Sequence, residues 1–115
     1  MATRDVLRAA KALIEQGWTQ GCSARESKGY SVSATYGGAT QFCAVGALER
    51  AAWESGAAPK REIEAQVHLR SALEARTGKA YPSVSEYNDK SNRTKAEILS
   101  LFDEAILIAE KADPQ

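Results

Sequence analysis

The sequence predicts a mainly α-helical fold: a single helical domain over residues 1–115, with four main helices and a small β-hairpin or irregular excursion between the first two. Apolar residues recur at helical spacing over most of the chain. Alanine, the residue with the highest helix propensity, occurs 21 times. The one long stretch without helical spacing is 18–39. A chain of 115 residues has the usual size of one domain and can bury a core without a metal or a disulfide.

The first helix is predicted over residues 4–16. Thr3 is the expected N-cap, and Asp5 lies in the first turn, where a negative charge stabilises the helix dipole. Gly17 is a typical residue just after a helix end. Side chains at helical spacing define one apolar face, which consists of Val6, Leu7, Ala10, Leu13 and Ile14.

The following stretch, 18–39, favours strand rather than helix. Residues 30–36 alternate weakly between polar and apolar and are rich in strand-forming types. A turn at Ser27-Lys28-Gly29 could return this segment onto residues 22–25, so we expect a small hairpin. A loop of this length without helix is uncommon in a compact domain unless it has a function.

The second helix is predicted to begin near Gln41, with Thr40 as its N-cap, and to end at Gly56. Its expected buried residues are Phe42, Val45, Leu48, Ala52 and Trp53. The third helix is predicted from Pro59, which suits a first helical turn, to Thr77, with Gly78 as its stop. Its expected apolar stripe consists of Ile63, Val67, Leu69 and Leu73.

Two polar residues, Gln66 and Arg70, project into the middle of that stripe, which is unusual for a buried helix face. One interpretation is a buried polar network that ties down the loops, with Asp89 as the partner of Arg70. The other is a loosely packed face that is partly open to a partner. The sequence leaves both open.

The last helix is predicted over residues 95–112. Tyr81-Pro82 breaks the chain before it, and residues 83–89 are expected to form one short helical turn. Thr94 and Glu97 have the spacing of a capping box. This helix is the most apolar one, so we expect it to be central. Leu107 falls on its polar side, and a homodimer through Leu107 or the third helix stays an alternative.

Composition disfavours several classes of protein. The 15 basic residues balance the 15 acidic ones, whereas duplex nucleic-acid binders usually carry a basic face. The sequence has no run of about 18 apolar residues, which a transmembrane helix would need. The first residues lack the apolar stretch of a signal peptide, so a cytoplasmic location is expected. Cys22 and Cys43 are then expected to be reduced, with a disulfide between them as the minority alternative.

Cys43 is the one candidate nucleophile. Its expected place, about one turn into the second helix, favours a thiolate. His68, the only histidine, is expected to face solvent, and Asn88 or Asp89 could complete a Cys/His/Asn set. The competing interpretation is that Cys43 is a small buried apolar residue. The spacing of Cys and His fits no metal site, and no glycine motif for phosphate occurs, so we expect neither metal nor cofactor.

Two polar-aromatic loops carry the predicted binding residues, because loops on a rigid scaffold commonly bind ligands. One follows the first helix and the other precedes the last. The predicted binding residues are Trp18, Gln20, Arg70, Tyr87, Asn88, Asp89 and Arg93. In the competing interpretation Trp18 seals the end of the core, and Asn88 and Asp89 form a turn by bonding their own backbone.

Four short motifs suggest a family. They are Gly17-Trp18-Thr19-Gln20-Gly21, Phe42-Cys43-Ala44-Val45-Gly46-Ala47-Leu48, Tyr87-Asn88-Asp89 and Arg93-Thr94. The chain resembles a family of small uncharacterised phage and bacterial proteins with a GWxxG … CAxGAL … WND … RT pattern. It departs from that pattern at Tyr87, where the family has Trp. The resemblance implies a phage or mobile-element setting and no known activity. It singles out Trp18, Cys43, Asn88, Asp89 and Arg93.

Three functions are compatible with the sequence. The first is a non-enzymatic module that binds a host or phage protein, for example to inhibit a host defence system such as a CRISPR complex. The second is a small-ligand or nucleotide binder that uses Trp18, Tyr87, Arg70 and Arg93. The third is a thiol enzyme that uses Cys43. The absence of a catalytic motif favours the first.

Overall fold

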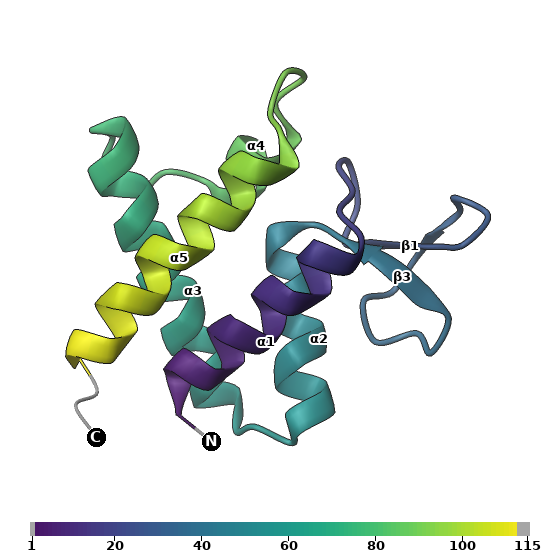
Figure 1. The fold of residues 1–115 in the computed structure, drawn as a ribbon, viewed down its shortest axis with the longest axis horizontal. Helices are drawn as coiled ribbons and strands as arrows, with labels where there is room; N and C mark the ends of the chain where they lie inside the picture. Colours follow the sequence, from purple (N-terminus) through teal and green to yellow (C-terminus); the bar gives the residue numbers. More distant parts are fainter. Residues whose placement is uncertain (1, 113–115) are drawn as a thin grey trace.

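A computed structural model describes residues 2–112 and has a mainly α-helical fold, as predicted (Figure 1). This part of the chain contains five helices rather than four, and a three-stranded sheet rather than a hairpin. The elements are α1 (Thr3–Gln16), β1 (Ala24–Glu26), β2 (Ser31–Val32), β3 (Ala39–Phe42), α2 (Ala44–Ser55), α3 (Pro59–Thr77), α4 (Val84–Asp89) and α5 (Lys95–Ala112).

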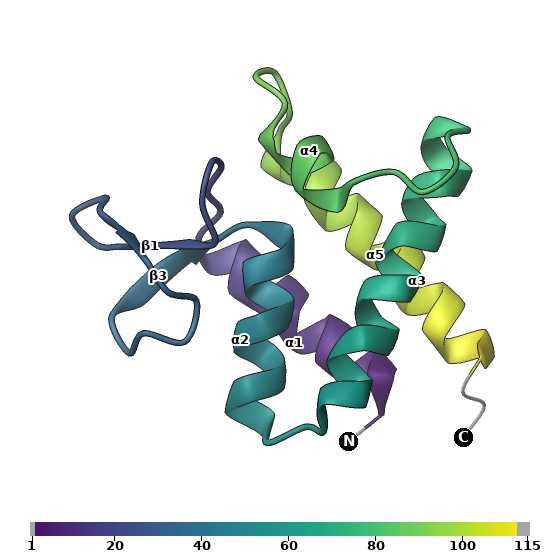
Figure 2. The same cartoon turned by 180° about the vertical axis from the view of Figure 1, so that it is seen from behind.

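The core lies between the four long helices. α5 packs on α1 and α3, and α1 packs on α2, α3 and α5, so α1 is the more central of the two (Figures 1 and 2). The expectation that the last helix is the central one is therefore wrong. α5 still buries one apolar face, which consists of Ile98, Leu101, Phe102, Ala105, Ile106 and Ala109. The largest fully buried apolar side chains are Phe102, Leu7, Ile14, Leu48, Leu69, Leu73, Ile98, Leu101 and Val6.

Most predicted helix ends are confirmed, because they depend on neighbouring residues alone. Gly56 and Gly78 end α2 and α3 in the left-handed conformation. The capping box at the start of α5 forms: the N–H of Glu97 donates to Thr94 Oγ1 at 3.2 Å, and the N–H of Thr94 donates to Glu97 Oε1 at 2.9 Å. The Thr94 N–H also holds the pKa of Glu97 below its ordinary value.

Thr3 is not the N-cap of α1. Ala2 has that position, and the Asp5 carboxylate accepts the Ala2 N–H at 3.1 Å. The Thr3 hydroxyl instead donates to Glu64 Oε1 at 2.7 Å, and this bond joins α1 to α3.

The predicted start of α2 is also wrong. Residues 39–42 form β3, and Cys43 rather than Thr40 is the N-cap. The reason is tertiary pairing: Phe42 lies opposite Ala24 in the antiparallel pair of β1 and β3. In addition, the Phe42 N–H donates to the Gly17 carbonyl at 3.0 Å, and the Phe42 carbonyl accepts the Thr19 N–H at 3.1 Å. These bonds hold the segment in an extended conformation.

The predicted hairpin exists as the antiparallel pair of β1 and β2, shorter than expected, with the turn at residues 27–29. β3 adds a third strand on the other side of β1, and the sheet lies at one end of the molecule (Figures 1 and 2). Arg25 ties this sheet to the preceding loop. Its guanidinium donates to Thr19 Oγ1 at 2.7 Å and to the carbonyls of Gln20 and Gly29 at 3.0 Å each.

Three large side chains that were predicted to be buried are exposed: Trp53, Ile63 and Val67, at 57%, 62% and 46%. α2 and α3 turn alanine-rich faces to the core instead. The buried residues of the two helices are Ala44, Gly46, Ala47, Leu48, Ala51 and Ala52 on α2, and Ala65, Leu69, Ala72 and Leu73 on α3. Small side chains let helices approach closely, so these alanine-rich faces pack in the core and Trp53, Ile63 and Val67 face solvent. Leu107 is exposed, as expected.

Two glycines permit close backbone contacts between the sheet and the helices. A Cβ at Gly46 would lie 2.1 Å from the Ser23 carbonyl oxygen, and a Cβ at Gly17 would lie 2.3 Å from the Thr40 carbonyl oxygen. Both contacts are with backbone, which cannot move aside as a flexible side chain can. Gly17 and Gly46 both belong to the motifs of the family resemblance.

We expect Gly46→Ala to destabilise the protein by about 3 kcal/mol, at the upper end of the usual cost of overpacking a core. The added methyl group would force α2 away from the β1 end of the sheet. The free energy of unfolding by urea measures this. Gly37→Ala is the matched control, because a Cβ there meets no atom within 4 Å. Equal stability of the two variants would contradict the close approach.

Candidate binding sites

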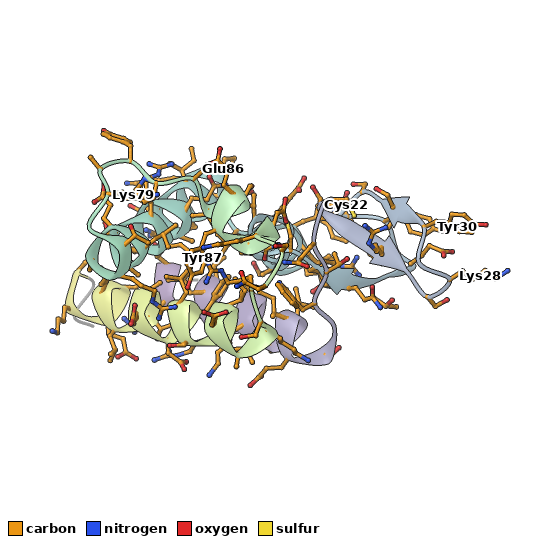
Figure 3. All side chains as sticks on the ribbon, turned by 90° about the horizontal axis from the view of Figure 1, so that it is seen from above. Cys22, Lys28, Tyr30, Lys79, Glu86 and Tyr87 are labelled. Atoms are coloured by element: carbon orange, nitrogen blue, oxygen red, sulfur yellow. The ribbon has the colours of Figure 1, made fainter. Side chains whose placement is uncertain are left out.

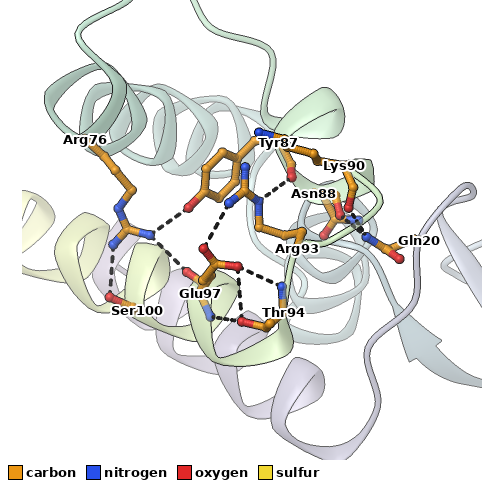
Figure 4. A network of polar contacts seen from close by, with 9 residues as sticks. All are labelled: Gln20, Arg76, Tyr87, Asn88, Lys90, Arg93, Thr94, Glu97 and Ser100. Atoms are coloured by element: carbon orange, nitrogen blue, oxygen red, sulfur yellow. Dashed lines mark hydrogen bonds and ion pairs between the residues drawn. The ribbon is translucent and has the colours of Figure 1, made fainter.

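The two loops predicted to bind a partner lie against each other. Trp18 Nε1 donates to Asn88 Oδ1 at 2.9 Å. Gln20 Nε2 donates to the carbonyls of Asn88 and Lys90, both at 2.9 Å (Figure 4). The Gly21 N–H donates to Asp89 Oδ1 at 3.0 Å. The structure thus brings four of the predicted binding residues together, across about seventy positions of sequence.

Asn88 is the centre of this junction and is fully buried. Its Oδ1 accepts two bonds, from Trp18 Nε1 at 2.9 Å and from the Ala44 N–H at 3.1 Å. Its Nδ2 donates to the Thr19 carbonyl at 3.1 Å and to Asp89 Oδ1 at 2.9 Å. Since the Ala44 N–H belongs to the first turn of α2, one side chain joins that helix, the 18–21 loop and the end of α4. We call this arrangement the Asn88 junction.

The neighbouring aromatic residue, Tyr87, lies in a second network. The Arg93 guanidinium stacks over the Tyr87 ring, 3.5 Å from its centroid, and donates to the Tyr87 carbonyl at 2.8 Å and to Glu97 Oε2 at 3.0 Å. The Tyr87 hydroxyl accepts a bond from Arg76 at 3.0 Å (Figure 4). Arg76 also pairs with Glu104 at 3.0 Å. Sequence reasoning missed Arg76, because only the tertiary packing of α3 on α5 shows its role.

These contacts bear on the role of the predicted residues. Trp18, Gln20, Asn88, Asp89 and Arg93 each have a partner inside the protein, which agrees with the interpretation that Trp18 seals the core. Asn88 and Asp89, however, bond the 18–21 loop rather than only their own turn. A binding role for these residues stays a prediction.

Cys43 is the N-cap of α2 and is not one turn into the helix. Its Sγ accepts the Gly46 N–H at 3.3 Å, and its own N–H donates to the Ser23 carbonyl at 3.0 Å. The thiol is buried, and burial raises its pKa; the nearby Asp89 carboxylate acts in the same direction. Cys22 and Cys43 are both free thiols. His68 was expected to face solvent and does so in part: it is partly exposed and lines a groove with Thr3 and Ala112.

The predicted pairing of Arg70 with Asp89 does not form. The Arg70 guanidinium lies over the Tyr81 ring instead, 5.8 Å from its centroid. Gln66 and Arg70 border a cavity of about 270 Å³ between α2, α3 and the start of α4. Of the two interpretations of these polar residues, the partly open face agrees with this geometry.

A cluster of three exposed or partly exposed residues lies on α2 and the loop before β3. It consists of Tyr36, Arg50 and Trp53, which we call the Trp53 patch. The Arg50 Cζ is 5.5 Å from the centroid of the Trp53 ring. Its Nη1 donates to the carbonyls of Ala34 and Tyr36, at 3.1 and 2.7 Å. Sequence reasoning missed this patch, because it assigned Trp53 to the core.

Comparison with known proteins identifies the family of this chain. The chain belongs to a family of unknown function, DUF6197. The family match covers residues 1–107 and so includes all four motifs described above. No curated protein and no solved structure matches the chain significantly. The family adds no activity or partner to the evidence from geometry.

Residues 2–112 contain neither a candidate membrane-spanning helix nor a candidate metal site. No helix within 2–112 combines the length and the apolar character needed to cross a bilayer. No group of three or more His, Cys, Asp and Glu side chains in that range could hold a metal ion.

We expect Asn88→Ala to destabilise the protein by about 3 kcal/mol, because it leaves the buried Ala44 N–H and the partly buried Trp18 indole N–H without their acceptor. Chemical denaturation measures the change. Asn92→Ala is the matched control: Asn92 is exposed in the next turn, and its loss is expected to change stability by no more than about 0.5 kcal/mol. Similar values for both variants would refute the central role of the Asn88 junction.

Cys43 is expected to react slowly with iodoacetamide in the native protein. Because its pKa is raised, less of the Cys43 thiol is ionised near pH 8.5 than in a free cysteine, which has its pKa at about that value. A Cys22→Ser variant leaves Cys43 as the one thiol to follow by mass spectrometry. Labelling is expected to become fast only in denaturant. Fast native labelling near pH 7 would instead favour the thiol enzyme.

Proposed function

We propose that the protein is a non-enzymatic protein-binding module whose contact surface is the Trp53 patch. The observation that carries this proposal is the exposure of Trp53, 57%, on a helix that buries alanines instead. Trp, Tyr and Arg are the residue types that contribute most to binding energy at protein interfaces. Trp53 and Tyr36 are exposed, Tyr36 at 54%. The Arg50 side chain is only 12% exposed and connects them, because it lies over the Trp53 ring and bonds the Tyr36 carbonyl.

Contacts within the fold hold Arg50 and Tyr36 of this patch in place. The Arg50 guanidinium donates to two backbone carbonyls and, through Nε, to Glu54 Oε2 at 2.8 Å. The Tyr36 ring packs over Gly38, where a Cβ would lie 2.7 Å from the ring. Side chains that are already ordered lose little entropy on binding, which favours affinity.

The two other functions have less support. A thiol enzyme needs an activated nucleophile, whereas Cys43 is buried with a raised pKa and caps a helix. A ligand site built from Trp18, Tyr87, Arg70 and Arg93 needs free polar groups. The Trp18 indole N–H and the Arg93 guanidinium are already bonded within the fold.

As to setting, we propose that the protein is a phage-type accessory protein that acts in the bacterial cytoplasm on a host or phage protein. The motif resemblance supports this setting, and inhibition of a host defence system is its most concrete form. The test is to express the protein in bacteria with an active CRISPR system and to measure plating of a targeted phage. Restored plating is expected, and plating that stays suppressed with several defence systems would argue against an anti-defence role.

Trp53→Ser is expected to weaken partner binding about 30-fold or more, the effect of losing an interface residue worth about 2 kcal/mol. Captured proteins from infected and uninfected bacterial lysates are quantified by mass spectrometry for each variant. Leu107→Ser is the matched control, because Leu107 is equally exposed, at 58%, but lies on α5. A partner that both variants retain would exclude the Trp53 patch as the contact surface.

A further inference from the structure

The cavity between α2, α3 and α4 is lined by both apolar and polar side chains, with one cation at its edge. Its volume is about 270 Å³, and its apolar lining includes Val45, Leu48, Leu69 and Val84. Leu48 and Leu69 are fully buried side chains of the core, so they form a fixed floor. A cavity of this size, just below the range of about 300–1,000 Å³ typical of ligand sites, suits a small apolar group.

The cation is Arg70. Within residues 2–112 its guanidinium has neither a hydrogen bond nor an ion pair, and it lies over the Tyr81 ring. Glu74, one turn further along α3, lies near Arg70 but forms no ion pair with it, and its Oε2 accepts the Tyr81 N–H at 3.0 Å. This contrasts with Arg25, Arg50, Arg76 and Arg93, whose guanidinium groups all donate to oxygen atoms of the fold.

Two features prepare Arg70 to bind an anion. The Tyr81 ring lies on one side of the guanidinium, and its backbone, at a φ of 49°, is held there by the bond to Glu74. Gln66 lies one turn before Arg70 on the same wall of the cavity, and its amide has no partner in the described part of the chain. The planar fork of a guanidinium matches a carboxylate with two parallel hydrogen bonds, and an amide N–H adds a third donor.

We propose that this cavity binds a carboxylate attached to a small apolar group, with the apolar group between α2 and α4 and the carboxylate on Arg70. This chemistry has two sources: a free aliphatic acid, or the C-terminal residue of a peptide. The site is separate from the Trp53 patch, so the proposal stands or fails independently of the proposed function.

The test is an NMR titration of the full chain that follows the Arg70 side-chain Nε–Hε signal. The probes are 4-methylpentanoate and acetyl-Gly-Leu with a free carboxylate, each compared with its primary amide. Both sources of the ligand chemistry predict that the acid shifts this signal and that the amide does not. If both 4-methylpentanoate and the peptide bind, a free aliphatic acid is sufficient as the ligand. If only the peptide binds, the ligand is the C-terminal residue of a peptide.

Three variants test the assignment of the cation. Because Arg70→Gln and Arg70→Lys lack the Arg70 signal, their binding is followed through the backbone amide signals of Val45 and Val84, which line the cavity. Arg70→Gln is expected to weaken binding about tenfold or more, and Arg70→Lys by less, because Lys keeps the charge but loses the paired hydrogen bonds. Lys60→Gln, which removes an exposed charge from the same helix, is expected to bind as the native protein does. Because Arg70 has no hydrogen bond to the fold, the melting temperatures of the Arg70 variants are expected to equal that of the native protein.

The proposal is overturned if neither acid shifts the Arg70 signal at millimolar concentration. It is also overturned if acid and amide bind equally, or if Arg70→Gln binds the acid as well as the native protein does. A carboxylate held by Arg70 is incompatible with each of these results.

Discussion

The buried amide of Asn88 is the interaction on which the arrangement of the helices and the sheet depends. It has two acceptor and two donor positions, and all four are used, by Trp18, Ala44, Thr19 and Asp89. An unsatisfied polar group at this depth would cost stability, so the three segments around it are fixed in one relative position. In the described residues, no buried side-chain nitrogen or oxygen lacks a partner. The Trp53 patch and the Arg70 cavity both border α2, whose first turn this amide holds.

The parts of the fold that the sequence predicted correctly depend on neighbouring residues. Gly56, Gly78 and the Thr94–Glu97 pair end or begin helices through bonds within a few positions, so their effect is readable from local chemistry. The start of α2 was not readable. Phe42 is held in a strand by Ala24, Gly17 and Thr19, which are 18 or more positions away. Propensity favours helix at that point, and tertiary pairing overrides it.

The candidate sites follow the same division. The residue types of the two polar loops were recognised from sequence, but their mutual bonds depend on a fold that brings Gln20 to Asn88. Trp53 was misassigned because a large apolar residue at helical spacing usually belongs to a core. In α2 the adjacent alanines pack instead, and the largest side chain of the helix faces outward. An alanine-rich face indicates close helix packing as well as a stripe of leucines does. In α2 the alanines, and not Trp53, mark the buried face.

The Asn88 junction also has a consequence for synthesis of the chain on the ribosome. Trp18 leaves the ribosome seventy residues before its hydrogen-bond acceptor does. Until then the 18–21 loop and the first turn of α2 lack the hydrogen bonds that Asn88 supplies. Contacts that are distant in sequence slow folding and prolong such states. The nascent chain therefore reaches its native arrangement late, when the segment that contains Asn88 has emerged.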